Sequence, residues 1–98
     1  MNIKQKKEDK KLTIFISGRV DTNTAPELLE NLKESMVGIE ELILDLADVE
    51  YISSAGLRVI LFAQKTMNSQ GSMSVAHVSN DIMDVFELTG FTDILTII

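Results

Sequence analysis

Two adjacent serines, directly before a run of small and apolar residues, are the side chains with the clearest potential for chemistry. The run reads Ser53-Ser54-Ala55-Gly56-Leu57 and is followed by Arg58. A serine at a helix start accepts a hydrogen bond from a backbone amide and stabilises the helix by about 1 kcal/mol. A serine hydroxyl at an exposed corner is also a suitable phosphoacceptor. Ser54 is therefore interpreted as a helix cap, a phosphorylation site, or both.

A phosphate on Ser54 would control binding without unfolding the chain. It adds a charge of about −1.5 to −2, which the free amides and the dipole of a helix N-terminus tolerate. Arg58 follows one helical turn later and is placed to pair with the phosphate. A partner docked at this corner would lose several kcal/mol through like charges or a desolvated phosphate. A loss of about 3–4 kcal/mol weakens binding by two to three powers of ten, which is enough for a switch.

Other chemistry has little support in the sequence. Ser54 as a catalytic nucleophile needs a base, and His77, the one imidazole, is expected to be a half-buried structural residue of a strand. The carboxylates considered as metal ligands are Asp21, Asp45, Asp48 and Glu50. Their spacing matches no calcium loop, so we expect a solvated acidic rim around Ser54. No nucleotide-binding glycine motif occurs, and we predict a binding protein without enzyme activity, cofactor or metal.

The composition is that of a small acidic globular protein. Its 98 residues, 45% of them apolar, predict a single domain over residues 1–98 with an economical core. Cysteine is absent, which excludes disulfides and thiolate metal sites. The net charge of −6, and the acidic residues within the basic run Lys4–Lys11, disfavour nucleic-acid binding. No apolar stretch is long enough for a membrane span or a secretory signal, so we expect a cytoplasmic protein.

The first third of the chain predicts two strands and a helix. Leu12–Ser17 alternates apolar and polar side chains, and Ile3–Lys7 is expected to pair with it as an antiparallel edge strand. We expect Gly18 to end the second strand. A capping box at Thr24–Glu27 predicts a helix that ends at Gly38. Its apolar stripe comprises Ala25, Leu28, Leu29, Leu32 and Met36.

The rest of the chain predicts three further strands and two helices. The strands are expected at Leu42–Leu46, Ser72–Val78 and Ile94–Ile98, and the helices at Ser54–Ser69 and from a cap at Ser79 to Gly90. Leu42–Leu46 is nearly all apolar, as in a strand buried on both faces, and Asp48–Ser54 is expected to be a loop. The residues expected to reach water from the long helix are Arg58, Gln64, Lys65 and Asn68. The predicted order is β-β-α-β-α-β-α-β, an α/β fold with a small mixed sheet flanked by helices.

Four segments together form a recognisable pattern. They are Gly18-Arg-Val-Asp21, Leu42-Ile-Leu-Asp-Leu46, Tyr51-Ile-Ser-Ser-Ala-Gly-Leu-Arg-Val-Ile-Leu61 and Leu88-Thr-Gly-Phe91. In this order and spacing they resemble STAS domains of bacterial anti-sigma factor antagonists, over about residues 3 to 98. The resemblance implies the same small mixed sheet with flanking helices.

The resemblance also implies a partner and a modification. The partner is an anti-sigma factor that is also a serine kinase of the GHKL ATP-binding type, and its capture frees a sigma factor. The phosphoacceptor of the family falls on Ser54, with Ser53 as the less favoured choice, and a PP2C-type phosphatase restores binding. The implied partner-binding residues are Asp21, Glu50, Ser53, Ala55, Gly56 and Arg58. The protein is expected to be a monomer or a weak homodimer.

Two features depart from the family pattern. Antagonists usually carry Asp where this chain has Ser53, so the choice between the two serines stays open. Members also commonly continue with a C-terminal helix, whereas this sequence stops at Ile98, which leaves self-association as one way to cover a sheet face. Two alternatives remain: a STAS scaffold that regulates a phosphatase, a transporter or a stressosome-like assembly, and a ligand or nucleotide sensor.

Overall fold

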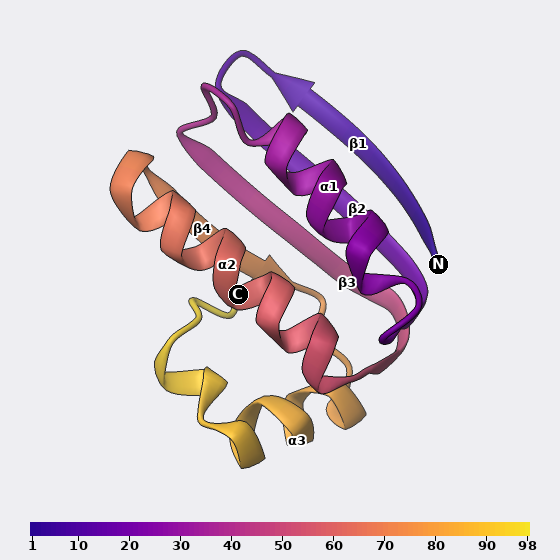
Figure 1. The fold of residues 1–98 in the computed structure, drawn as a ribbon. Helices are drawn as coiled ribbons and strands as arrows, with labels where there is room; N and C mark the ends of the chain where they lie inside the picture. Colours follow the sequence, from indigo (N-terminus) through magenta and orange to yellow (C-terminus); the bar gives the residue numbers. More distant parts are fainter.

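Four strands form one mixed sheet, and the computed structural model describes residues 1–98 (Figure 1). The elements are β1 (Asn2–Glu8), β2 (Lys11–Val20), α1 (Ala25–Ser35), β3 (Glu41–Ile52), α2 (Ser54–Gln70), β4 (Ser72–Ala76), α3 (Asn80–Thr89) and a short 3-10 helix η1 (Phe91–Asp93). The strand order is β1-β2-β3-β4, with β1 antiparallel to β2 and the other two pairs parallel. The predicted mixed-sheet α/β fold is confirmed.

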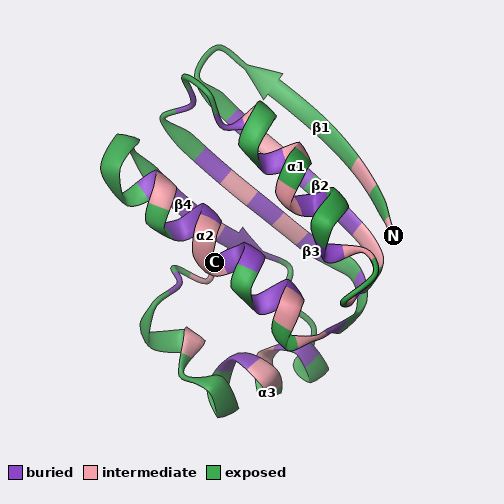
Figure 2. Ribbon diagram, in the orientation of Figure 1, coloured by how far each residue is buried: buried purple, intermediate pink, exposed green.

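Most of the core lies between one face of the sheet and the helices α1 and α2, and Ile82 and Phe86 of α3 and Leu95 of the tail belong to the same buried cluster. Because α1 and α2 each connect two parallel neighbouring strands with the same hand, both lie side by side on this face (Figure 1). The strand side chains of this core that are at most 3% exposed are Leu12, Ile14, Ile16, Val20, Leu42, Leu44, Leu46, Met73 and Val75. Figure 2 shows the resulting alternation of buried and less buried residues along β3.

The opposite face of the sheet is more open than predicted. Phe15 on this face is 41% exposed, and its strand partner on β3, Asp45, is only partly buried. Ile43 is also only partly buried. The prediction that Leu42–Leu46 is buried on both faces is therefore wrong, because the two crossover helices cover the same face.

Strands β2 and β3 extend further than predicted. Gly18 does not end β2, since it lies inside the strand with a positive φ of 86°. The segment predicted as a loop before Ser54 is mostly strand, and β3 continues to Ile52. The register between the two strands shifts twice, once between Phe15 and Ser17 and once between Gly18 and Arg19. Such bulges interrupt the alternation of side chains, which explains why the sequence pattern resembled a loop.

The helices follow the predicted stripes, but the predicted capping box of α1 is absent. The stripe of α1 is confirmed, with Leu28 and Leu32 fully buried. Thr24 makes no capping hydrogen bond, because its hydroxyl donates to the Arg19 carbonyl at 2.8 Å. In α2, Gln64 is only 7% exposed, so the prediction that it reaches water is wrong.

The end of the chain agrees only in part with the prediction. Ser79 caps α3 as predicted, accepting a hydrogen bond from the Ile82 amide at 3.3 Å, and Gly90 ends the helix with a left-handed φ of 79°. The predicted last strand is reduced to an isolated bridge between Val75 and Ile97. Because β4 stops at Ala76, it offers the tail only a short edge for pairing.

No helix of the structure has the length and apolar character that a membrane span requires.

Candidate functional site

The two serines lie where two parallel strands end together. Val20, the last residue of β2, pairs with Ile52, the last residue of β3. The amide of Ser53 donates a hydrogen bond to the Val20 carbonyl at 2.9 Å, and α2 begins at Ser54. The residue after Val20 is Asp21, so the parallel register brings the predicted Asp21 and serine positions to the same corner of the molecule.

The cap of α2 is Ser53 and not Ser54. Ser53 has an extended backbone, with φ −92° and ψ 175°, and its Oγ accepts a hydrogen bond from the Gly56 amide at 3.3 Å. Ser54 is the first helical residue and is exposed, whereas Ser53 is half-buried. The interpretation of Ser54 as a cap is therefore wrong. Its hydroxyl stands at the surface without this structural role.

A glycine lets the first turn of α2 approach the strand ends closely. A Cβ added at Gly56 would lie 2.8 Å from Val20 Cγ1 and 2.8 Å from Ile52 Cγ1. Both side chains belong to the core, so neither can move away freely. Gly56 is itself buried, and its contribution to the predicted docking surface is to hold the first turn in place.

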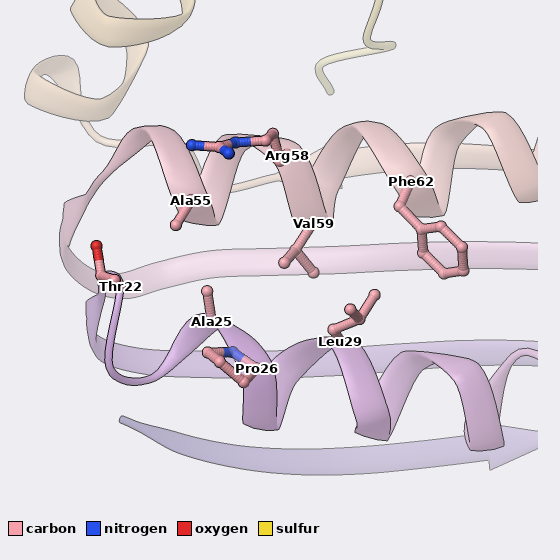
Figure 3. A pocket seen from close by; sticks show the side chains of 8 residues that line it. All are labelled: Thr22, Ala25, Pro26, Leu29, Ala55, Arg58, Val59 and Phe62. Carbon is pink, nitrogen blue, oxygen red and sulfur yellow. The ribbon is translucent and has the colours of Figure 1, made fainter.

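Arg58 lies over the first turn of α2. Its Nε is 3.4 Å from the carbonyl oxygen of Ser54 and donates a hydrogen bond to it. The side chain is exposed and takes part in none of the ion pairs of the structure. Figure 3 shows the guanidinium along the outer side of the helix. This is the one-turn spacing from Ser54 that the sequence predicts.

Asp21 organises the loop that faces the serines. Its Oδ1 accepts hydrogen bonds from the amides of Asn23 at 3.0 Å and Thr24 at 3.1 Å, and its Oδ2 lies 3.7 Å from Arg19 Nε. Partial desolvation raises the pKa of the Asp21 carboxyl, but hydrogen bonds from Thr24 and Asn23 and the charge of Arg19 outweigh it, so the pKa is lowered. The carboxylate is thus ionised at neutral pH and ties the loop together.

An arginine and a tyrosine near this corner were missed in the sequence. The Arg19 guanidinium lies 4.3 Å from the centre of the Tyr51 ring, in a cation–π contact. Tyr51 is 42% exposed, and its neighbour Glu50 is exposed as predicted. Arg19 on β2 and Tyr51 on β3 are strand partners, a pairing that no local sequence pattern indicates.

Asp45 does not belong to the predicted acidic rim around Ser54, and the environment of His77 differs from the predicted one. Asp45 lies well before the end of β3, where its Oδ2 is 2.9 Å from His77 Nδ1. His77 follows β4 with a φ of 56°, and its side chain is 70% exposed. The prediction of a half-buried strand residue is therefore wrong, and the imidazole contacts Asp45 rather than Ser54. No group of three or more potential ligands is arranged to hold a metal ion.

An apolar groove separates α1 and α2 beside the serine corner (Figure 3). Its volume is about 330 Å³, and it is lined by Thr22, Ala25, Pro26, Leu29, Ala55, Arg58, Val59 and Phe62. Ala55 and Arg58 are predicted partner-binding residues, and the side chains of α1 complete the groove. The sequence could not indicate it, because it depends on how far apart the two helices pack.

The fold and the matched sequence define the family. Residues 1–98 match the STAS domain model, and the chain belongs to the STAS domain family. It is 35% identical to the anti-sigma-B factor antagonist of Listeria monocytogenes over 99% of this chain and 86% of the relative. It is 31% identical to the anti-sigma-B factor antagonist of Bacillus subtilis, over 99% of this chain and 90% of that protein. The resemblance seen in the sequence is confirmed.

Solved structures share this fold at low sequence identity. An anti-sigma factor antagonist from Mycobacterium paratuberculosis superposes with a TM-score of 0.89 at 21% identity, covering 98% of this chain and 83% of that one. The Bacillus cell fate determinant SpoIIAA in its phosphorylated form gives a TM-score of 0.77 at 12% identity, covering 99% and 91% of the two chains. At such identities the likeness concerns the fold alone.

Proposed function

We propose that this chain is an anti-sigma factor antagonist, a binding protein without enzyme activity that captures an anti-sigma factor and so frees a sigma factor. The observation that carries the proposal is the exposed hydroxyl of Ser54 at the start of α2, beside a helix cap that Ser53 already provides. The names of its relatives, anti-sigma-B factor antagonists, support the same partner class.

Phosphorylation of Ser54 would switch the binding off. The anti-sigma factor would itself be the kinase, of the GHKL ATP-binding type, and a PP2C-type phosphatase would reverse the modification. Exposure favours Ser54 over Ser53, whose half-buried oxygen accepts the Gly56 amide. A phosphate on the first residue of α2 lies near free helical amides and one turn from Arg58, so the fold tolerates it.

The docking surface would be centred on the corner where β2 and β3 end. Ser53, Ser54 and Ala55 form its middle, Glu50 lies on one side, and the loop held by Asp21 lies on another. A phosphate at its centre would meet the partner's surface directly, and like charges there cost several kcal/mol. We propose further that residues 1–98 act as one domain, in the cytoplasm, as a monomer or weak homodimer.

A pull-down from an extract of the source cells tests the proposal. The immobilised chain should retain an anti-sigma factor in the absence of ATP and lose it after incubation with ATP. Mass spectrometry should find one added phosphate on Ser54. A phosphate confined to Ser53 would contradict the choice of residue.

Two matched variants separate the switch from other effects of the serine. Ser54→Ala should retain the anti-sigma factor with and without ATP, because it cannot be phosphorylated. Ser54→Asp should fold normally but bind at least about tenfold more weakly, since one charge imitates only part of a phosphate. Equal binding by both variants would argue against the switch.

A further inference from the structure

We propose that the groove between α1 and α2 receives an amphipathic segment of the anti-sigma factor, with an apolar side chain seated between Leu29 and Val59 and an acidic side chain at Arg58. The inference rests on the proposed function and adds to it a second contact region, on the helix side of the serine corner. It also assigns the partner segment a stated chemistry.

The floor and walls of the groove are apolar. Figure 3 shows Leu29 and Val59 pointing toward each other from the two helices, with Phe62 beside them. Leu29 and Phe62 are only partly buried, so the chain itself does not fill the space between them. Two parallel helices with an apolar trough between them suit a helix-in-groove mode of binding, in which apolar anchors enter and polar residues stay at the rim.

Arg58 is the one charged residue that lines the groove, in a chain whose net charge is −6. Arg58 and Lys65 are exposed and, because seven residues make about two helical turns, they lie on the same side of α2. Neither forms an ion pair within the chain. On α1 the charges of Glu30 and Lys33 compensate each other at 3.8 Å, and the other two acidic residues of this helix, Glu27 and Glu34, do not line the groove. The groove therefore presents unpaired positive charge to its occupant, and an acidic segment is the complementary partner.

The groove is also continuous with the proposed switch. Ala55, directly after Ser54, lines the end of the groove nearest the serines together with Arg58 and Thr22, at the left in Figure 3. A phosphate on Ser54 would compete for the Arg58 guanidinium and repel an acidic segment lying beside it. Both effects act on the same occupant, so one modification would weaken the anchor as well as the central contact.

The test is a calorimetric titration of the 98-residue chain with the anti-sigma factor retained in the pull-down. Leu29→Glu places a negative charge in the groove, and Leu88→Glu is its control, because Leu88 is 88% exposed on α3, away from the groove. Leu29→Glu should weaken binding at least about 30-fold, the loss typical of a buried anchor, while Leu88→Glu should stay within about threefold of the native chain.

A second pair of variants tests the charge at the rim without disturbing the packing. Arg58→Gln should weaken binding about tenfold and flatten its dependence on salt, because it removes an ionic contact. Lys4→Gln is the control, since Lys4 is an exposed cation on β1 that also forms no ion pair. Circular dichroism establishes that each variant is folded.

Each outcome decides a different claim. If the native chain binds but folded Leu29→Glu binds as well as Leu88→Glu does, the groove is not the contact and only the proposed function stands. If Leu29→Glu does not fold, unchanged binding by Arg58→Gln overturns the inference in the same way. If the native chain retains no anti-sigma factor, both proposals are wrong.

Discussion

The assignment of separate roles to two neighbouring serines leads to a direct experiment. Ser53→Ala removes the oxygen that accepts the Gly56 amide at 3.3 Å, whereas Ser54→Ala removes an exposed hydroxyl at the next position. The two variants delete the same group from adjacent residues. They therefore test the position of the helix cap with little else changed.

The expected losses follow from the geometry of the cap. Replacing a capping serine by alanine costs about 0.5–2 kcal/mol, and a bond of 3.3 Å lies at the long end of useful hydrogen bonds. We therefore expect Ser53→Ala to lower the free energy of unfolding by about 0.5–1 kcal/mol. For a domain of this size the melting temperature would fall by about 2–8 °C. Ser54→Ala should change the free energy of unfolding by less than about 0.5 kcal/mol.

Urea and thermal unfolding followed by circular dichroism measure both variants under one set of conditions. Phosphorylation by the anti-sigma factor in the presence of ATP supplies the complementary measurement. Ser53→Ala should still accept a phosphate, and Ser54→Ala should not. A reversal, with Ser54→Ala the less stable of the two, would mean that α2 is capped by Ser54 and that the accessible hydroxyl belongs to Ser53.

Three further predictions concern the same corner. Gly56→Ala should lower the free energy of unfolding by about 1–2 kcal/mol, because the new methyl group would lie 2.8 Å from Val20 Cγ1; an unchanged urea midpoint would contradict the close packing. The pKa of Asp21 is lowered in the folded state, so its ionised carboxylate stabilises the fold at pH values above the unfolded pKa near 3.8. The stability advantage of the native chain over Asp21→Asn should disappear as the pH falls through the folded pKa. An advantage that grows in acid would show that the pKa is raised and not lowered. Arg58→Ala should leave the melting temperature of the unmodified protein nearly unchanged but lower that of the Ser54 phosphoprotein, and equal shifts in the two forms would exclude a phosphate contact.

The elements that were predicted well are those whose pattern is local. The alternation in Leu12–Ser17 and the stripe of α1 identify a strand and a helix, because spacing along the chain decides which side chains share a face. The Ser79 cap and the Gly90 stop likewise depend on a few consecutive residues. The family motifs belong to this group, and they identified the STAS domain before any packing was known.

The elements that were predicted wrongly depend on distant partners. The sequence predicts a loop at the end of β3, because two bulges against β2 break its alternation. The sequence of Leu42–Leu46 predicts a fully buried strand, although an apolar run does not reveal whether helices cover one face of the sheet or two. The sequence predicts His77 in a strand, whereas β4 ends at Ala76 and the His77 imidazole contacts Asp45 on the neighbouring strand.

The sequence by itself determined the family, the mixed α/β fold and the presence of a serine pair at the start of a helix. Only the tertiary structure decided which serine caps the helix, because the amide of Ser53 is held by the Val20 carbonyl of another strand. It also created the groove, whose two walls come from helices that are separate in the chain. Hydrophobic periodicity acts within a segment, whereas strand registers, grooves and the choice between Ser53 and Ser54 as the cap are settled by contacts between segments.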